Sequence, residues 1–317
     1  MSTESPTRPT DPAPPPAAEP QRRPTTTHGE RPSLLFRVLA TAVMVLAAAY
    51  FLLPVYWMVV ASTKSTGQLF STPGFEFADL QLGHNLAELS RYDGGIYWRW
   101  VANTVVYSVI GSVLTVAVCA TCGYALAVFR FRGRAVVLAA VLGSMLVPNT
   151  VLAQPIYLLV VELGLNNTYW GVLLPSMVFP FGVLLCTIYA QSSIPTELLE
   201  AARLDGAGEL RIFFQVVLPL SKPVIAVIAL FYAVTFWNEW FHALLYISEP
   251  AKYPLQLVLQ NLITSVANAA DLGTVTAAPV YQMRLAMTVI TIGPILLAYP
   301  FAQRYFVKGL TLGATKG

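Results

Sequence analysis

Residues 197–223 read "ELLEAARLDGAGELRIFFQVVLPLSKP" and carry seven charged side chains. The segment before them, 163–196, carries none. Because a charged side chain is costly inside a bilayer, this contrast separates the solvent-exposed part of a chain from the part buried in lipid. We therefore interpret 195–223 as a connection that lies at a membrane surface and is anchored by a membrane helix at each end.

The composition of the whole chain indicates a membrane protein. Of its 317 residues, 56% are hydrophobic and 11% are charged, against about a quarter charged in an ordinary soluble domain. A spanning helix needs about 20 apolar residues and satisfies all of its own backbone polar groups in hydrocarbon. The sequence predicts an all-α membrane protein with six transmembrane helices, one in each of six long segments that are uncharged apart from Glu239: 38–63, 100–129, 135–161, 163–196, 223–248 and 285–303.

The positions of the Lys and Arg residues predict how the chain is oriented, because cytoplasmic loops are enriched in them. If the amino terminus is inside, 14 of the 19 Lys and Arg residues face the cytoplasm. Both termini are then cytoplasmic in a multi-pass protein of the cell membrane. Only five cations fall outside: Lys64, Arg91, Arg99, Lys252 and Arg284.

The first 32 residues differ from the rest of the chain. They are rich in Pro, Thr, Ala and Arg and have no apolar periodicity, so they cannot bury enough surface to offset the entropy that is lost on ordering. We expect a disordered cytoplasmic tail at 1–32 and a transmembrane domain at 33–317. The first apolar run is too long for the apolar region of a signal peptide, so we interpret it as a retained helix.

Three cysteines, Cys119, Cys122 and Cys186, fall inside the expected helices. The first two match C-x-x-C, a spacing found in redox and metal sites, but the sequence has no βαβ pattern, no second pair and no nearby His. Small side chains let membrane helices approach closely, which favours a packing role. The histidines are far apart in the sequence. No metal site and no cofactor is predicted in this chain.

Two neighbouring expected helices contain paired prolines: Pro148 and Pro155 in one, Pro175 and Pro180 in the next. Each proline removes a backbone donor and leaves a carbonyl that another group must satisfy. Broken helices are tolerated at membrane depth beside protein or beside a water-filled cavity. The prolines are therefore compatible with a packing kink and with a translocation pathway.

The polar connection is predicted to form two short helices that are hinged at a glycine. Thr196 is placed to cap the first helix, and Gly206 supplies the left-handed residue at which a helix commonly stops. The second helix is expected at about 208–216. Small side chains at Ala201 and Ala202 would let the first helix seat in a groove of another protein, and charge pairs would fix its register. The candidate charged residues are Glu200, Arg203 and Asp205. A helix that rests on lipid headgroups would instead have a strongly basic polar face, and this one is more acidic than basic.

Glu239 is the one charged residue inside the fifth expected helix, in "TFWNEWFHA". A charge at mid-bilayer costs at least about 2.5 to 3.5 kcal/mol, so it should face a cavity or a partner, or be protonated. Trp237, Asn238 and Trp240 flank it. Aromatic rings beside amide and carboxyl groups suit a sugar, which has an apolar face and a hydroxyl rim, but the same residues suit a hydrogen-bonded cluster between subunits. Both interpretations remain open.

The polar connection also matches a known sequence pattern. Membrane subunits of ATP-binding-cassette importers carry E-A-A-x-x-x-G, nine further residues and then I-x-L-P, and this chain has Glu200, Ala201, Ala202, Gly206 and "VVLP" at 216–219. Valine stands at 216 where the pattern has isoleucine. The segments "FWNEWFHALLYI" at 236–247 and "YFVKGLTLGATKG" at 305–317 resemble the carbohydrate-uptake branch. Over about 33–317 the chain thus resembles the second permease subunit of maltose-type sugar importers.

The resemblance implies a type I importer permease fold whose EAA coupling helices, in 195–223, bind an ATPase dimer. Such a subunit pairs with a homologous permease subunit, receives a sugar from an extracytoplasmic solute-binding protein and has no nucleic-acid partner. ATP and Mg²⁺ would belong to the ATPase chains, in agreement with the absence of a G-x-x-x-x-G-K-[ST] loop from this sequence. The resemblance also implies a second contact between the carboxyl tail and the ATPase, for which a frayed end is the alternative. The tail residues are Gly309, Gly313, Lys316 and Gly317.

Three other classes of function share some of these sequence features: importers of other solutes, ion-coupled transporters and membrane enzymes. Permeases for glycerol phosphate share the coupling pattern and the ending, and importers of amino acids, phosphate or polyamines share the coupling pattern. An ion-coupled secondary transporter would use Glu239 as its coupling site, but it predicts internal repeats and paired ionisable residues in the spans, which the sequence lacks. A membrane enzyme is disfavoured because Glu239 is the only candidate acid and no His or Cys cluster accompanies it.

Overall fold

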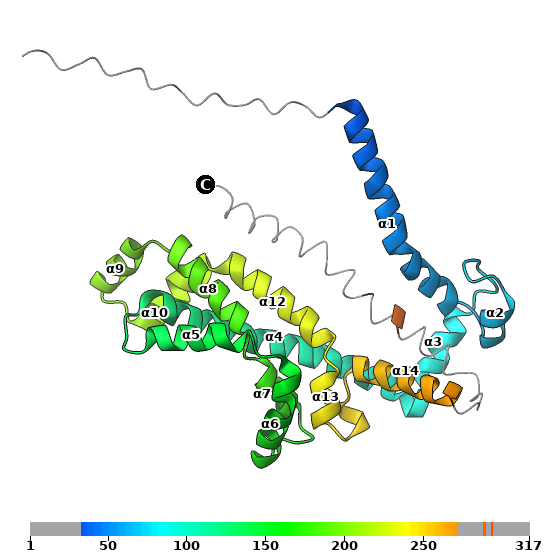
Figure 1. Ribbon diagram of the computed structural model, residues 1–317. Helices are drawn as coiled ribbons and strands as arrows, with labels where there is room; N and C mark the ends of the chain where they lie inside the picture. The colour runs from blue at the N-terminus through cyan, green and yellow to red at the C-terminus, as the bar shows by residue number, and fades with distance from the viewer. Residues whose placement is uncertain (1–32, 272–287, 290–292, 294–317) are drawn as a thin grey trace, which may run out of the picture. The chain divides into compact units, whose positions relative to one another are not determined.

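The computed structural model describes residues 33–271 together with 288, 289 and 293, and the regular structure of these residues is helical without strands (Figure 1). The chain forms two units, Met1–Leu52 and Leu53–Gly317. The disordered tail expected at 1–32 lies outside the described residues. Of the sixth helix expected at 285–303, the structure describes 288, 289 and 293 alone. The helices are α1 (Leu34–Ser62), α2 (Thr66–Ser71), α3 (Leu82–Arg91), η1 (Tyr92–Gly95), α4 (Ile96–Val128), α5 (Arg134–Ser144), α6 (Asn149–Glu162), α7 (Tyr169–Ser176), α8 (Pro180–Ser193), α9 (Thr196–Leu204), α10 (Glu209–Ile212), η2 (Phe213–Val217), α11 (Leu218–Leu220), α12 (Lys222–Trp237), α13 (Phe241–Tyr246), η3 (Pro250–Lys252) and α14 (Leu255–Asp271).

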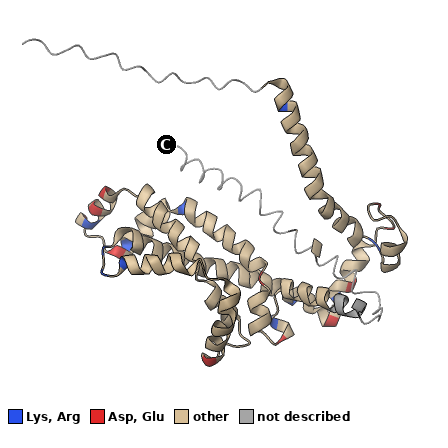
Figure 2. Cartoon of the chain, in the orientation of Figure 1, with Lys and Arg blue, Asp and Glu red and all other residues tan. Residues whose placement is uncertain are grey.

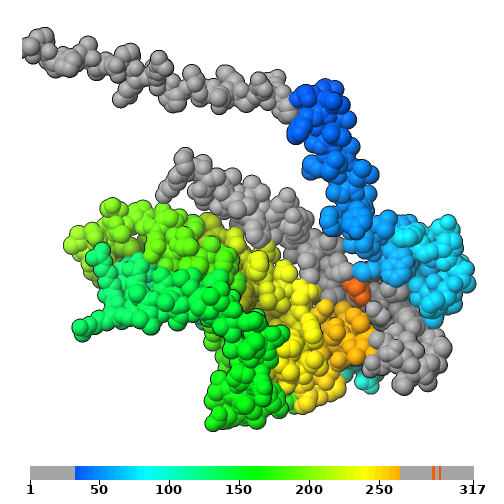
Figure 3. Space-filling model, viewed as in Figure 1, coloured from blue at the N-terminus to red at the C-terminus, as the bar shows by residue number. Residues whose placement is uncertain are grey.

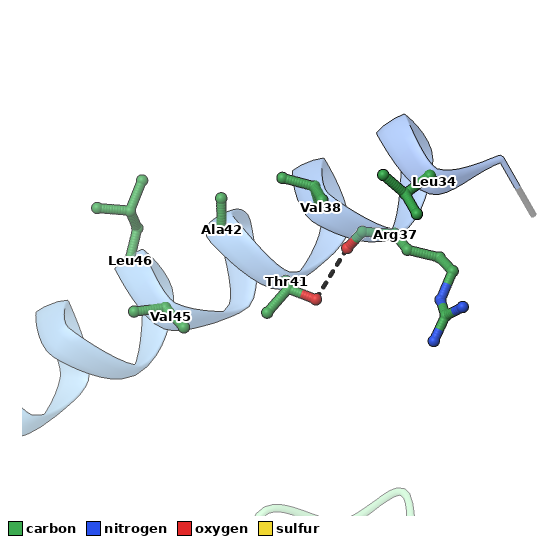
Figure 4. Close-up of a pocket in the computed structure, with 7 residues that line it drawn as sticks. All are labelled: Leu34, Arg37, Val38, Thr41, Ala42, Val45 and Leu46. Atoms are coloured by element: carbon green, nitrogen blue, oxygen red, sulfur yellow. Dashed lines mark hydrogen bonds between the residues drawn. The ribbon is translucent and has the colours of Figure 1, made fainter.

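Helix α1 exposes apolar side chains along most of its length, and only its last residues, Val60, Ala61 and Ser62, are buried. Figure 4 shows a hollow whose described lining comes from this helix alone, with Arg37 as its one charged side chain. The hydroxyl of Thr41 has no free donor there, because it donates to the carbonyl of Arg37 at 2.8 Å. An apolar surface of this kind suits lipid contact rather than binding of a polar ligand.

Helix α4 is the centre of the second unit and packs against α8 and α12. Glycines allow the close approach. A Cβ on Gly123 would overlap Cys186, and a Cβ on Gly111 would overlap the ring of Phe236. Cys119 is buried in the same contact, and its thiol donates to the carbonyl of Phe179. The packing role expected for the cysteines is therefore confirmed for Cys119 and Cys186, whereas Cys122 is exposed.

A proline lies at each of the three sharp bends in the described part of the chain. Pro148 precedes α6, where the α5–α6 pair bends by 110°, and Pro180 begins α8, where the α7–α8 pair bends by 46°. Pro155 and Pro175 instead lie inside α6 and α7. The third bend, 79°, separates residues 209–220 from α12, whose second residue is Pro223. Breaks at Pro148 and Pro180 follow from the lost donor and from the conformational restriction on the residue before proline.

Among the described residues, two helical stretches without a sharp bend, Leu34–Ser62 and Leu82–Val128, are long and apolar enough to cross a membrane. Up to five spans result if each of the three bent pairs is one span. These segments cover five of the six regions expected from the sequence. The expected 223–248 helix is shorter than predicted, because α12 ends at Trp237 and a separate helix, α13, begins at Phe241.

Candidate functional site: a hinged helix pair at one end of the bundle

The polar connection forms the expected hinged pair, α9 followed by α10, between the membrane helices α8 and α12 (Figure 1). Helix α9 begins one residue earlier than predicted. Pro195, not Thr196, is the N-cap, and its carbonyl accepts from the N–H of Leu198 at 3.3 Å. The prediction that the Thr196 side chain caps α9 is therefore wrong. Proline suits the cap position because that residue donates no hydrogen bond to the helix and its φ of −63° is close to the value that the ring imposes.

Helix α9 ends at Leu204, and Gly206 is the left-handed residue that stops it, as predicted. This glycine has φ +78°, a left-handed conformation that other residues rarely adopt. The N–H of Ala207 donates to the carbonyl of Ala202 at 3.0 Å, and the N–H of Gly206 donates to the carbonyl of Arg203 at 3.0 Å. These two bonds form a Schellman motif, which satisfies carbonyls at the helix end and turns the chain sharply.

The second helix is longer than the predicted 208–216. It begins at Glu209 and continues through α10, η2 and α11 to Leu220. Its middle part, η2, is a π-helix in which the N–H of Leu218 donates to the carbonyl of Phe213. Pro219 explains the wider turn, because its ring would clash with the carbonyl four residues earlier in a regular α-helix.

Apolar side chains fix the hinged pair to the bundle. Leu199 from α9 and Ile212 from α10 are 2% and 1% exposed. They share a buried cluster with Tyr124 of α4, Ala190 of α8 and Ile194, which directly follows α8. Because one side of both short helices is buried in this way, the pair is attached to the bundle by packing as well as by its two covalent ends.

Five of the six residues predicted to couple to an ATPase lie on the open side of the pair; Glu200, Ala201, Arg203, Asp205 and Gly206 are exposed. Ala202 differs, because it is half-buried against the cluster beneath the pair. It therefore does not share an exposed shoulder with Ala201. The 3.6-residue period of a helix separates adjacent residues by about 100°, which places these two alanines on different faces.

Large apolar side chains that the sequence reasoning did not single out are exposed on the same pair: Leu198, Leu204, Leu210 and Phe214. Leu204 is 90% exposed and Leu210 is 77% exposed. Figure 2 shows charged residues gathered on α9 and α10, and Figure 3 shows residues 196–204 on the surface at the left edge of the view. Exposed apolar groups among charges are typical of a surface that binds another protein.

Two charged residues of the pair bind each other across the glycine turn. Arg203 donates from Nε to Oε1 of Glu209 at 2.7 Å and from Nη2 to Oε2 at 3.3 Å. The hydroxyl of Tyr124 also donates to Oε2, at 3.1 Å. The hydrogen bonds from Arg203 hold the pKa of Glu209 below its ordinary value. Sequence reasoning identified Arg203 but missed Glu209 and Tyr124, since nothing in their spacing indicates the contact.

The second predicted group surrounds Glu239 at the break between α12 and α13. Glu239 accepts from the backbone N–H of His242 at 2.9 Å, so its side chain caps α13. Its other oxygen lies 3.0 Å from Nδ1 of the His242 ring. The two side chains are 11% and 18% exposed, respectively. Glu239 therefore has a partner within its own chain, and His242, which the sequence reasoning left aside, is that partner.

The other three residues of this group also lie at the break. Asn238 is exposed and donates from Nδ2 to the carbonyl of Val234 at 2.8 Å. Trp237 ends α12 and Trp240 precedes α13, and both are half-buried. Trp240 packs against the cluster of buried side chains that contains Phe236. The break thus brings the four predicted residues together at one place in the fold.

Two asparagines that sequence reasoning did not select hold the connection between α13 and α14. Asn103 of α4 donates from Nδ2 to the carbonyl of Ala251 at 2.9 Å. Asn167 accepts at Oδ1 from the N–H groups of Ser248 and Glu249, at 3.2 and 3.1 Å. Partners more than 80 residues away satisfy these backbone groups, so no local pattern could predict the contacts.

The predicted tail residues, Gly309, Gly313, Lys316 and Gly317, lie outside the described residues. Within the part of the chain that the structure describes, no group of three or more His, Cys, Asp or Glu side chains could hold a metal ion.

Comparison with known proteins places these features in context. The family model described as "Binding-protein-dependent transport system inner membrane component" matches residues 119–311. Protein LplC of Bacillus subtilis is 41% identical over 224 residues, which are 70% of this chain and 75% of that protein. The arabinooligosaccharides transport system permease protein AraQ of Halalkalibacterium halodurans is 36% identical over 225 residues, 71% of this chain and 76% of that one.

Two further similarities extend over nearly the whole chain. The polygalacturonan/rhamnogalacturonan transport system permease protein YtcP of Bacillus subtilis is 32% identical over 289 residues, 89% of this chain and 99% of that protein. A solved structure, described as a bacterial ABC transporter involved in the import of the acidic polysaccharide alginate, superposes with a TM-score of 0.75 and 27% identity. The match covers 87% of this chain and 98% of that one.

Proposed function

Because the chain belongs to the family of binding-protein-dependent transport system inner membrane components, we propose that it is a membrane-spanning permease subunit of an ATP-driven carbohydrate importer. The names of two relatives refer to arabinooligosaccharides and to polygalacturonan or rhamnogalacturonan, and the similar solved structure is described as an importer of alginate. These cargoes are all built from several sugar units. They support an oligosaccharide as the substrate of this chain.

The observation that carries the proposal is the hinged pair α9–α10. It is held against the bundle by Leu199 and Ile212 and exposes Leu204 and Leu210 among charged residues. A surface that is rigidly attached on one side and apolar on the other suits a protein partner that pushes on the membrane helices. We assign that role to a pair of ATPase subunits, which bind ATP and Mg²⁺ and hydrolyse the nucleotide.

The proposed architecture has six transmembrane helices in a type I permease fold. Five correspond to α1, α4 and the three bent pairs, and the sixth to 285–303. The excess of Lys and Arg on one side, 14 against five, supports cytoplasmic termini and a cytoplasmic hinged pair. The other half of the pathway comes from a homologous permease subunit, and an extracytoplasmic solute-binding protein delivers the sugar.

The proposed pathway includes the break between α12 and α13, where Trp237, Asn238, Glu239 and Trp240 lie. Helices broken at membrane depth line polar cavities in many transporters. The exposed amide of Asn238 is the polar group of this set best placed to meet a sugar hydroxyl. The proposed carboxyl-tail contact, Gly309 to Gly317, adds a second attachment to the ATPases.

Reconstitution of the complete complex tests the function. The permease pair and its ATPases are placed in vesicles with the solute-binding protein. ATP hydrolysis is measured with a panel of mono-, di- and oligosaccharides and with amino acids, polyamines and glycerol phosphate. We expect at least one oligosaccharide to stimulate hydrolysis and to accumulate in the vesicles. Stimulation only by amino acids, by polyamines or by glycerol phosphate would refute the assignment to carbohydrates.

Labelling of the permease subunits in the membrane without their ATPases, which would cover the hinged pair, tests the orientation. Leu204→Cys places a thiol on the hinged pair, and Leu80→Cys, at a residue that is 73% exposed between α2 and α3, is the matched control. An impermeant maleimide should label the first variant only from the cytoplasmic side and the second only from outside. The reverse pattern would contradict the coupling role of α9.

A further inference from the structure

We propose that Tyr124, Glu209 and Arg203 form a positioning link that ties both helices of the hinged pair to α4, so that a movement imposed on α9 is delivered to this membrane helix. The inference rests on the proposed function, since it assumes that an ATPase moves α9. It adds Tyr124 and Glu209 to the residues that couple the ATPase to the membrane helices. Neither is a fixed position of the E-A-A-x-x-x-G pattern.

The link joins three separate elements. Arg203 lies in the last turn of α9, Glu209 is the first residue of α10, and Tyr124 lies near the end of α4. Glu209 is the shared partner, because Arg203 reaches both of its oxygens and Tyr124 reaches one of them. A single carboxylate therefore connects the two short helices to each other and to the membrane helix.

The position of the Arg203–Glu209 contact relative to the hinge explains its effect. Gly206 lies midway between the two residues, and a Cβ there would meet nothing within 4 Å. The turn is therefore open on the side of Gly206, whereas Leu199 and Ile212 hold the two helices from the bundle side. The two hydrogen bonds from the planar guanidinium add a restraint on the angle between α9 and α10, since a two-point contact restrains orientation as well as distance.

Tyr124 is held in place by packing. Its side chain is buried, and its ring packs against Phe129 and Phe213 with centroid separations of 5.5 and 5.6 Å. The hydroxyl is therefore held at a defined place at the end of α4. A displacement of Glu209 must stretch this hydrogen bond or carry α4 with it.

Arg211 provides a matched control on the same short helix. Its Nε donates to Oε1 of Gln215 at 3.1 Å, a contact within one helical stretch. This contact also uses a surface arginine, but its acceptor is a neutral amide and it does not reach α4 or cross the glycine turn. Its removal should leave the coupling between α9 and α4 unchanged.

The test compares transport with ATP consumption in the reconstituted complex. Tyr124→Phe removes only the hydroxyl, and Glu209→Gln removes the charge that Arg203 binds. For either variant we expect the number of sugar molecules imported per ATP to fall by roughly threefold to tenfold, the range that the loss of one hydrogen bond produces in an equilibrium. Co-purification of the ATPases should remain normal. Arg211→Ala should keep the wild-type ratio.

A charge exchange separates a positioning role from a general loss of stability. Arg203→Glu combined with Glu209→Arg restores an ion pair across the turn and leaves an arginine beside the Tyr124 hydroxyl, which then accepts the bond. We expect Arg203→Glu alone to lower the number of sugar molecules imported per ATP, and the double variant to restore most of that number. Wild-type ratios in Tyr124→Phe and Glu209→Gln, or no recovery in the double variant, would overturn the link. A wild-type complex that imports no carbohydrate would instead refute the proposed function.

Discussion

Glu239 and His242 face each other across the break between α12 and α13, with the backbone N–H of His242 donating to one carboxylate oxygen and its ring nitrogen close to the other. The break thus has a side-chain cap of its own. This relationship decides how Glu239 should respond to substitution, because a cap and a pathway residue differ in what they require from the carboxylate.

Glu239→Leu should destabilise the break, whereas Glu239→Gln should not. Glutamine keeps an oxygen that accepts from the N–H of His242, but leucine leaves that donor unsatisfied, at a cost of about 1 kcal/mol for a lost cap. Thermal unfolding of the purified complex measures the difference. Uptake assays on Glu239→Gln then address the pathway: a fall in transport with unchanged stability supports contact with the sugar, and unchanged uptake favours the purely structural role.

Gly206→Pro should abolish binding of the ATPase while the subunit remains in the membrane. Proline cannot adopt the φ of +78° found at this position, because its ring fixes φ near −65°. Gly206→Ala is the milder variant and should weaken binding, since a left-handed alanine costs about 1 to 2 kcal/mol. Co-purification with the ATPase measures both effects. Normal recovery of the ATPase with Gly206→Pro would contradict the role of the hinged pair in binding.

The attachment of α9 to α10 should weaken at low pH. Arg203 lowers the pKa of Glu209, so the ion pair stabilises the folded pair at and above the ordinary glutamate pKa of about 4.3 and is lost as the pH falls through the lower, folded-state value. Hydrogen exchange of the α9 amides, corrected for the intrinsic effect of pH, should therefore rise only below about pH 4.3. Glu209→Gln should remove this dependence. A rise near neutral pH would show that another group controls the attachment.

Gly123→Val should disrupt the packing of α4 on α8. The new side chain would overlap Cys186, and its Cβ would lie 3.1 Å from the backbone N of Thr187. Overpacking of this kind typically costs about 1 to 3 kcal/mol. Gly143→Ala in α5 is the control, because its added Cβ meets nothing within 4 Å. A lower unfolding temperature is expected for the first variant only, and equal temperatures would contradict the close α4–α8 contact.

The sequence predicts helix positions where local properties, such as the length of an uncharged run or a glycine at a turn, decide them. Uncharged runs place the membrane helices, because a bilayer excludes charge over a length that the sequence displays directly. Gly206 was predicted to end α9 for a similar reason, since few other residues adopt a left-handed conformation. The second helix was predicted too short, because the π-turn that accommodates Pro219 depends on the packing of Phe213 and Val217 beneath it.

The roles of individual charges were less predictable. Arg203 was expected to bind a partner protein, and the structure adds a contact with Glu209. Glu239 was expected to face a cavity or a partner, or to be protonated, and the structure shows that it caps α13. In both cases the partner lies within six residues, but whether the two side chains meet depends on a turn between them. For Arg203 and Glu209, packing of Leu199 and Ile212 on the bundle also sets how the two short helices lie.

By itself, the sequence determined the membrane-embedded character of this protein, the hinged polar connection and the family to which it belongs, because hydrophobic length, charge distribution and a glycine at a left-handed turn are local properties. Only the tertiary structure decided that Tyr124, 85 residues before Glu209, joins the hinge to α4. The physical reason is that such a contact depends on the relative placement of helices, which side-chain packing over the whole bundle sets and no short segment encodes.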